Sequence, residues 1–225
     1  MQLTVLYWNT AGSKTNDALA LVERREYDVI ALQEPWYNRQ QKTTYCPARG
    51  RYRRIFGNGR AALYVHKRHG IGTWTQRTGQ DWCSATFGEG SESITIWSVY
   101  SPNPQERPWQ SPLTELAASA PRGRNVIVGD MNLHHPLWDR EGRTSPRVGE
   151  LLTLAQRWTL SLATPYGEPT RVRQGQRDST IDHAWASESL QVTYLGDPGY
   201  AGSDHRAQLI RIEGAPSMPK DRPEG

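Results

Sequence analysis

Short apolar segments with strand-like patterning recur along almost the whole chain, and this feature limits the possible folds most strongly. Helical spacing is confined to Asn16–Arg25, Pro112–Ser119 and Arg147–Trp158. Many strands with few helices between them fit two packed sheets with helices outside, so we expect an α/β fold. The expected strands are Gln2–Trp8, Asp28–Gln33, Tyr52–Phe56, Ala61–His66, Ile71–Trp74, Cys83–Phe87, Ile94–Tyr100, Asn125–Gly129, Leu160–Ala163, Thr170–Arg173, Ser179–Ala186, Gln191–Leu195 and Arg206–Ile212.

The length of 225 residues fits one domain with a sizeable core, which we place at residues 1–213. Residues 214–225 are rich in proline and charge, and this composition is typical of a flexible linker to a further segment. No apolar run is long enough to cross a bilayer, and the first residues lack the features of a signal peptide, so we expect no membrane partner. Cys46 and Cys83 lack metal-site spacing, and buried free thiols are favoured over a disulfide.

The charge is distributed unevenly although its net value is only +4. The stretch Pro35–Gln80 holds ten Lys or Arg and no Asp or Glu, so the other residues carry a net charge of −6. This asymmetry indicates one surface that faces a polyanion and a clustered acidic site elsewhere. Arginine supplies 23 of the 27 basic residues, which favours phosphate ligands because the guanidinium pairs with them through two donors, although a genomic composition bias would have the same effect.

Polar residues with the chemistry of a site stand at the ends of several apolar strands. Any one of them could be a turn former or a helix cap, but their recurrence at loop positions favours a common site. These residues are Asn9, Glu34, Tyr100, Asp130, Asn132, Asp182, Asp204 and His205.

Cleavage of a phosphodiester would use this set of side chains. A hard cation needs oxygen ligands, for which Glu34 is suitable. Asp130 could accept a proton from the attacking water, and Asn132 and His205 could donate to the non-bridging oxygens. A carboxylate on the second imidazole nitrogen would fix the histidine tautomer, and either Asp182 or Asp204 could serve.

Six ordered motifs resemble the endonuclease/exonuclease/phosphatase superfamily, which includes apurinic endonucleases and DNase I-like enzymes. The resemblance covers Leu3 to Ile212, and the run from Gly129 to Trp138 is similar to the endonuclease domain of LINE-type (non-LTR) retrotransposons. The motifs are Trp8-Asn9, Leu32-Gln33-Glu34-Pro35, Val99-Tyr100-Ser101-Pro102-Asn103, Gly129-Asp130-Met131-Asn132, Ser179-Thr180-Ile181-Asp182-His183 and Ser203-Asp204-His205.

The resemblance implies a DNase I-like, four-layered α/β sandwich, in which two packed sheets are flanked by helices. It also implies a Mg²⁺-dependent nick in double-stranded DNA, with Mn²⁺ as an alternative metal, that leaves a 3′-hydroxyl to prime reverse transcription. A reverse transcriptase domain would then lie on the same full-length chain, and the protein would be intracellular and act in the nucleus.

Residue roles follow from the same motifs. The resemblance implies that Glu34 binds the metal with Asn9 and Asp204 nearby, and that Asp130 activates water. Asn132 would hold Asp130 or the phosphate, Tyr100 and His205 would contact the phosphate, and Asp182 would orient His205. DNA contacts are expected from Asn103 and His135.

A basic hairpin is expected before the Asp182 motif, because a glycine-centred turn lies between two strand-like segments. Arg171, Arg173 and Arg177 flank this turn, and in the related retrotransposon enzymes a hairpin here probes the DNA groove. An exposed basic turn without such a role is the alternative.

One departure from the family pattern concerns Ala11, because apurinic endonucleases often carry an acidic residue at that position. Its absence weighs against a second metal-site contribution and against strong repair activity. The alternatives that stay open are an apurinic/apyrimidinic repair endonuclease, a phosphatase of inositol lipids or sphingomyelin, and a DNA-binding module without catalysis.

Overall fold

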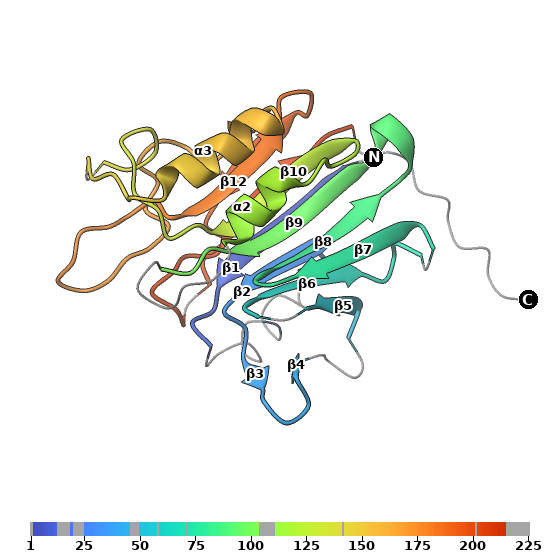
Figure 1. Ribbon diagram of the computed structural model, residues 1–225. Coiled ribbons are helices and arrows are strands. Elements are labelled where there is room, and N and C mark those ends of the chain that lie inside the picture. Colours follow the sequence, from blue (N-terminus) through green and yellow to red (C-terminus); the bar gives the residue numbers. More distant parts are fainter. Residues whose placement is uncertain are drawn as a thin grey trace, which may run out of the picture.

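Two six-stranded sheets pack face to face in the computed structural model, which describes residues 2–12, 19, 25–45, 50–57, 59–70, 72–103, 111–140, 142–200 and 202–214 (Figure 1). The first sheet has the strand order β13 (Val192–Gly196), β14 (Gln208–Ile212), β1 (Leu3–Asn9), β2 (Val29–Gln33), β6 (Ala61–His66) and β5 (Tyr52–Phe56). The second has the order β11 (Leu160–Leu162), β12 (Asp182–Ser187), β10 (Arg124–Asp130), β9 (Ile94–Tyr100), β8 (Trp82–Phe87) and β7 (Trp74–Gly79).

Each sheet is built around one parallel pair of strands, with antiparallel neighbours on both sides. β1 runs parallel to β2 in the first sheet, and β10 runs parallel to β9 in the second. Since β12 and β14 are antiparallel to β10 and β1, their first residues lie beside the last residues of those central strands. The sequence motifs at these strand ends are therefore brought to one end of the sandwich.

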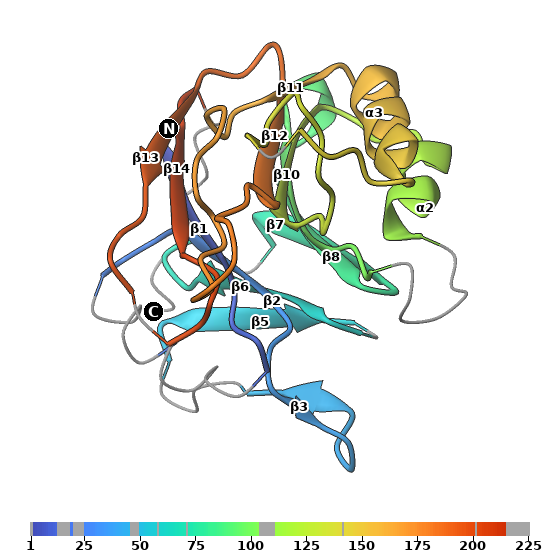
Figure 2. The ribbon, with the colours of Figure 1, turned by 90° about the vertical axis from the view of Figure 1, so that its left-hand side faces the viewer.

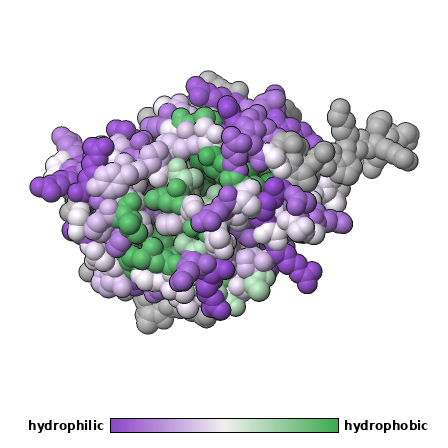
Figure 3. Space-filling model, turned by 90° about the horizontal axis from the view of Figure 1, so that it is seen from above, coloured by the Kyte–Doolittle hydropathy of each residue, from purple (hydrophilic) through white to green (hydrophobic). Residues whose placement is uncertain are grey.

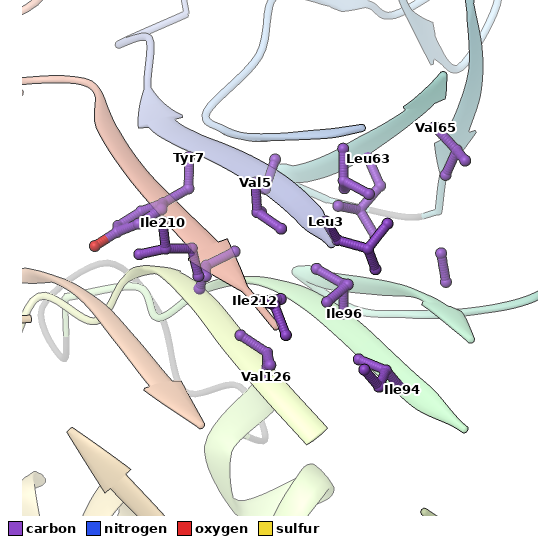
Figure 4. Close-up of a cluster of buried hydrophobic side chains, with 14 of the residues drawn as sticks. Leu3, Val5, Tyr7, Leu63, Val65, Ile94, Ile96, Val126, Ile210 and Ile212 are labelled. Atoms are coloured by element: carbon purple, nitrogen blue, oxygen red, sulfur yellow. The ribbon is translucent and has the colours of Figure 1, made fainter. Parts of the chain in front are cut away.

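The inner faces of the two sheets form the main core. Leu3, Val5 and Leu63 come from the first sheet and face Ile96 and Val126 of the second, and all five are buried (Figure 4). These positions alternate along their strands with side chains of the opposite faces, as the pleat of a strand requires. The core thus holds the ends of the two sheets in register with each other.

Helices α2 (Pro112–Ala118) and α3 (Val148–Arg157) cover the outer face of the second sheet (Figure 2). Ser111 caps α2 because its side chain accepts a hydrogen bond from the Leu113 amide, and Pro112 occupies the first turn. Seen from above the view of Figure 1, the molecule shows apolar side chains near the centre of its surface, surrounded by polar ones (Figure 3). A short 3₁₀ helix, η1 (Gly90–Glu92), precedes β9.

The structure confirms the predicted sandwich architecture of two sheets with helices outside. The outer face of the first sheet carries its own apolar cluster, to which Leu19 belongs. Of the predicted helix Asn16–Arg25, only Leu19 and Arg25 lie within the described residues. No helix in the described part of the chain is long and apolar enough to cross a membrane.

Three local predictions were wrong or incomplete. The strand expected at Ile71–Trp74 instead begins at Trp74 and runs to Gly79, because β7 is an exposed edge strand with mostly polar side chains. Thr170–Arg173 is no regular strand and has isolated bridges only at Arg171, while the strand expected at Ser179–Ala186 begins at Asp182. The small hairpin of β3 (Tyr37–Asn38) and β4 (Thr43–Thr44) was not predicted.

A side chain explains why Thr170 does not continue a strand. Its hydroxyl oxygen accepts hydrogen bonds from the amides of Ile181 and Asp182, at 2.9 and 3.0 Å. Such side chain to backbone bonds replace regular ladder bonds and are a known competitor of secondary structure. They also fix the first residue of β12, which belongs to the site described next.

Candidate active site

The predicted site residues meet at the end of the sandwich where the central strands finish. Asn9 ends β1 and lies opposite Gln33, the residue before Glu34. Asp130 ends β10 and lies between Tyr100 at the end of β9 and Asp182 at the start of β12. Strand register alone therefore brings together side chains that are far apart in the sequence.

The Asn9 side chain joins the two sheets at this point. Its Nδ2 donates to Asp130 Oδ2 at 2.8 Å and to Glu34 Oε2 at 3.1 Å. Its Oδ1 accepts from the Ala11 amide at 2.9 Å, which fixes the orientation of the side-chain amide. Asn9 is fully buried. One amide group that is shielded from solvent therefore holds both carboxylates, those of Glu34 and Asp130.

His205 lies between two buried carboxylates. Its Nδ1 is 2.9 Å from Asp182 Oδ2, and its Nε2 is 3.9 Å from Asp130 Oδ2. The carboxylate that orients the imidazole is therefore Asp182, one of the two alternatives that the sequence left open. With Nδ1 directed at Asp182, the Nε2 nitrogen faces Asp130.

These three groups shift the pKa values of one another. Burial, and then the charge of Asp182, raises the pKa of Asp130 above its usual range. Burial by itself would lower the pKa of His205, but the charges of Asp182 and Asp130 outweigh that effect and raise it. A carboxyl with a raised pKa beside an imidazole that favours its charged form suits proton transfer near neutral pH.

Two site residues adopt strained backbone conformations. Glu34 and Asn132 have φ values of +46° and +49°, in the left-handed region that residues other than glycine seldom adopt. Hydrogen bonds hold both: the Glu34 amide donates to Arg60 O at 2.8 Å, and the Asn132 amide donates to Asp130 Oδ1 at 2.9 Å. Strain of this kind gathers at functional sites, where surrounding contacts over-determine the backbone.

Asn132 uses its backbone and its side chain differently. The amide nitrogen of its backbone holds Asp130, while its side-chain Nδ2 donates to the Ser101 carbonyl at 3.0 Å. The residue thus connects the ends of β9 and β10, as the parallel register of these strands allows. A direct contact of Asn132 with phosphate stays a prediction.

Tyr100 is contacted by residues that the sequence did not single out for the site. The Arg60 guanidinium lies 4.2 Å from the centre of the Tyr100 ring, and its Nη1 is 3.5 Å from the phenol oxygen. Asp81, almost fully buried, accepts from the Arg60 amide at 2.8 Å. Arg60 and Asp81 lie in turns between strands, where no strand-end motif marks them.

Asp204 faces the basic segment that contains Arg171 and Arg173. Its Oδ2 is 3.0 Å from Arg171 Nε and 3.3 Å from Arg173 Nε. Burial would raise the pKa of Asp204, but the hydrogen bond from Arg171 and the nearby positive charges lower it. Asp204 is thus paired with arginines here, and its role beside a metal stays a prediction.

The other residues named from the sequence lie around this centre. His135 is half-buried and its ring centre is 5.1 Å from that of Trp138, while Asn103 is exposed. Arg171 and Ser179 exchange backbone hydrogen bonds of 3.0 Å, which confirms a hairpin-like turn over residues 171–179. DNA contact by these residues stays a prediction.

His183 has a structural role although it directly follows Asp182 in one of the motifs that the sequence analysis singled out. Its Nε2 is 3.0 Å from the Thr180 carbonyl and its Nδ1 accepts from the Trp185 indole at 3.4 Å, so both ring nitrogens have partners. Burial lowers the pKa of His183 to about 4. The neutral ring is therefore part of the core below the site.

The sequence from residue 94 to residue 209 matches the family described as endonuclease-reverse transcriptase. This match covers more than half of the chain and includes Asp130, Asn132, Asp182 and His205. The chain belongs to the endonuclease-reverse transcriptase family. No curated protein matches the sequence.

Solved structures show how widely this family's fold is shared. The endonuclease domain of TRAS1, a telomere-specific non-LTR retrotransposon, is 17% identical with a TM-score of 0.70 over 94% of this chain and 98% of that one. The Xenopus laevis APE2 catalytic domain is 13% identical with a TM-score of 0.61 over 96% and 91% of the two chains.

A third similar structure limits what the fold implies. The ferrous NO complex of a Cimex nitrophorin mutant is 13% identical, with a TM-score of 0.54 over 94% of this chain and 98% of that one. A protein described by a nitric oxide complex thus shares the architecture with nucleases, and function has to be argued from side chains.

The residues of this candidate site fit a divalent metal. Asp130, Asp182 and His205 each offer one ligand atom, and these atoms lie within 4.8 Å of one another. Glu34 adds a carboxylate held by the same Asn9 amide as Asp130. A set dominated by carboxylate oxygens suits a hard cation, whose charge would also relieve the repulsion between buried acids.

Proposed function

We propose that this chain is a Mg²⁺-dependent endonuclease that nicks one strand of double-stranded DNA and serves a non-LTR retrotransposon. The observation that carries the proposal is the buried assembly of Asp130, His205 and Asp182, tied to Glu34 through Asn9. Binding alone does not require two buried carboxylates around an oriented imidazole, whereas phosphodiester hydrolysis requires a base, a donor and a metal ligand. The family match and the TRAS1 fold support the same activity.

The chain's own residues divide the chemical work among them. Asp130, with its raised pKa, accepts a proton from the water that attacks the phosphorus. The P–O3′ bond breaks, and the 3′-oxygen takes a proton from solvent to leave as the 3′-hydroxyl, while the phosphate stays on the 5′ side. Protonated His205 donates from Nε2 to a non-bridging oxygen, while Asp182 keeps the ring oriented. Tyr100, held by Arg60, donates to the same phosphate.

Glu34 would hold the metal, and Asn9 would position its carboxylate. The family resemblance adds Asp204, which would have to release Arg171 and Arg173 to join the site. A bound Mg²⁺, or Mn²⁺ in its place, supplies positive charge that offsets the developing negative charge on the phosphate oxygens. Asn9 keeps the Glu34 carboxylate next to Asp130, so the metal ligand and the base stay adjacent.

A plasmid assay tests this function directly. Supercoiled plasmid should become open-circular in the presence of Mg²⁺, and excess chelator should abolish the reaction. Asp130→Ala should lower the rate by at least ~10²-fold, the scale of a lost general base. Equal nicking in chelator, or normal turnover by folded Asp130→Ala protein, would exclude this site as the catalytic centre.

A repair endonuclease is the second candidate, supported by the fold shared with APE2. An abasic duplex compared with an intact duplex of the same sequence separates the two. A retrotransposon nickase cleaves the intact duplex, whereas a repair enzyme cleaves the abasic one selectively. Inositol phosphates and sphingomyelin belong in the same assay, because their hydrolysis would identify a phosphatase.

Residues 1–213 are proposed as the endonuclease domain, followed by a linker at 214–225 and a reverse transcriptase domain on the same full-length chain. The family description, endonuclease-reverse transcriptase, supports this order. A 3′-hydroxyl at the nick could then prime DNA synthesis by the neighbouring domain, which would place its action in the nucleus.

A further inference from the structure

A basic cavity of about 370 Å³ opens beside the active site. Four of its lining residues are arginines, namely Arg143, Arg171, Arg173 and Arg177, and His134 and Ser179 also line it. Arg143 and His134 belong to neither the predicted groove reader nor the catalytic set. These two residues therefore share one cavity with the arginines of the hairpin.

Two separate segments build this cavity. The segment after β10 (yellow in Figure 1) brings His134 and Arg143, and the 171–179 hairpin (orange) brings the other arginines to the same end of the molecule. The His134 amide donates to Ser145 Oγ and the Ser145 amide donates to the His134 carbonyl, both at 2.8 Å. These reciprocal bonds hold the turn that carries Arg143 against His134.

Positive charge dominates the cavity. Asp204 accepts from the Nε groups of Arg171 and Arg173, and the buried Asp139 holds Nδ1 of His134. The four guanidiniums that line this space outnumber the carboxylates described there, Asp204 and Asp139. An excess of oriented guanidinium groups binds a phosphate oxyanion well, because each planar fork can present two donors to it.

The cavity adjoins the catalytic histidine through the backbone. Arg171 forms an isolated antiparallel bridge with His205, and the Val172 amide donates to the Asp204 carbonyl at 2.8 Å. On the other side of the bridge, the Arg206 amide donates to the Thr170 carbonyl at 2.7 Å. The cavity is therefore close enough to His205 for a phosphate next to the scissile one to reach it.

We propose that this cavity is a second phosphate subsite, which binds a backbone phosphate of the nicked DNA strand next to the scissile one. Arg143 and His134 complete it together with Arg171, Arg173 and Arg177. The inference rests on the proposed nicking of DNA and adds a positioning role. In this arrangement, the arginines at the base of the hairpin fix the position of the DNA strand along the protein. The tip of the hairpin, at Gln174 and Gly175, is the part that contacts base edges.

Salt dependence of DNA binding gives the first test. Wild-type protein, Arg143→Ala and the control Arg122→Ala are titrated with a fluorescent duplex in chelator, so that binding is measured without cleavage. Losing one phosphate contact reduces the slope of log affinity against log salt by about one. We expect this reduction for Arg143→Ala and an unchanged slope for Arg122→Ala, whose exposed side chain lies before β10. An unchanged slope for Arg143→Ala overturns the subsite.

Neutral linkages locate the contact on the DNA. Single methylphosphonates are placed at each linkage on both sides of a mapped nick. One adjacent position should weaken wild-type binding and should weaken Arg143→Ala binding no further, because the two changes remove the same contact. Arg143→Lys should restore part of the sensitivity. Additive losses at every position contradict the subsite, whereas wild-type protein that neither binds nor nicks DNA contradicts the proposed function itself.

Discussion

At the residue scale, the sequence predicts which side chains belong to the candidate site more readily than it predicts which of them contact one another. The sequence indicates several candidate site residues, because acids and histidines at strand ends seldom gather without a function. These are Glu34, Asp130, Asp182 and His205. The partner of each side chain follows only from register: Asp182 lies opposite Asp130, whereas Asp204 faces Arg171. Neither pairing is visible along the chain.

The contact of Asp182 with His205 predicts a positioning role, and replacing its carboxylate should separate orientation of the imidazole from folding. Asp182→Asn keeps the size of the side chain but removes the negative charge that orients His205 and favours its protonated form. We expect the plasmid-nicking rate to fall by at least ~10²-fold, as when the carboxylate of a His–Asp pair becomes an amide. DNA affinity should stay within about twofold of wild type.

The matched control is Asp197→Asn, an identical chemical change at an exposed residue whose Oδ1 accepts from the Gly199 amide. Its nicking rate should equal that of wild type. If Asp182→Asn is folded by circular dichroism and nicks normally, the orientation of His205 by this carboxylate does not matter for the reaction.

At the element scale, strands with apolar faces were predicted well and those without were not. β6 and β9 have the bounds that the sequence indicated, because both are buried and largely apolar along their whole length. β5 also has the expected bounds, and it buries Tyr52 and Ile55 on opposite faces. β7 was misplaced because an edge strand with exposed polar side chains gives no apolar alternation. The hairpin at 171–179 was expected from its central glycine, but its pairing with the His205 segment was not.

The tip of this hairpin should influence where DNA is nicked. The substitution Gln174→Ser preserves every lining residue of the basic cavity, Gln176 included, and removes a tip side chain that could reach base edges. Since base contacts select sequence while phosphate contacts position the protein, nick positions should redistribute on a fixed substrate. Total nicking should fall far less than for Asp130→Ala.

Primer extension across DNA nicked to the same extent gives the map. Arg122→Glu combined with Arg124→Glu, remote from the hairpin in sequence, should leave the nick pattern unchanged. An identical map for the hairpin variant, with folding intact, would assign sequence preference to another part of the surface.

Asp28, directly before β2, should make the largest contribution to the stability of the first sheet against unfolding at low pH. Asp28 accepts from the Thr4 amide, Arg68 and His69, and although burial opposes it, these bonds lower its pKa to about 2. Because the folded pKa is below the unfolded value of 3.8, this stabilisation is complete above about pH 4 and is lost as pH falls through about 2.

Asp28→Asn should therefore lower the free energy of unfolding by roughly 1–2 kcal/mol at pH 7, after allowance for the partly exposed Arg68. The difference from wild type should shrink as the pH is lowered from about 4 toward 2. Urea denaturation over this pH series measures it, and a difference that stays constant with pH would show that the charge of Asp28 is not the cause.

At the scale of the whole molecule, the sandwich explains why the charge asymmetry of the sequence is only partly visible on its surface. Several arginines of the acid-free stretch have partners within the protein. Arg51 pairs with Glu26, Arg68 with Asp28, Arg60 with Asp81, and Arg53 donates to the His69 carbonyl. The basic surface beside the site instead comes from Arg143 and the hairpin, outside that stretch.

DNA affinity should fall steeply with salt, because several arginines at this surface would displace counterions from the phosphate backbone. Log affinity should decrease linearly with log salt, and two or more phosphate contacts correspond to a loss of about tenfold or more between about 50 and 200 mM. Fluorescence anisotropy with an intact duplex in chelator measures the slope.

A small phosphorylated ligand gives a different result, since it has no condensed counterion layer of comparable density. Inositol hexakisphosphate, used as a competitor, should displace DNA only at concentrations far above that of an equal charge of duplex. Flat DNA binding over this salt range, together with tight inositol phosphate binding, would make the same site a phosphatase centre. A steep slope with weak competition would instead support the proposal that the buried carboxylates and the neighbouring arginines act together on one extended polyanion.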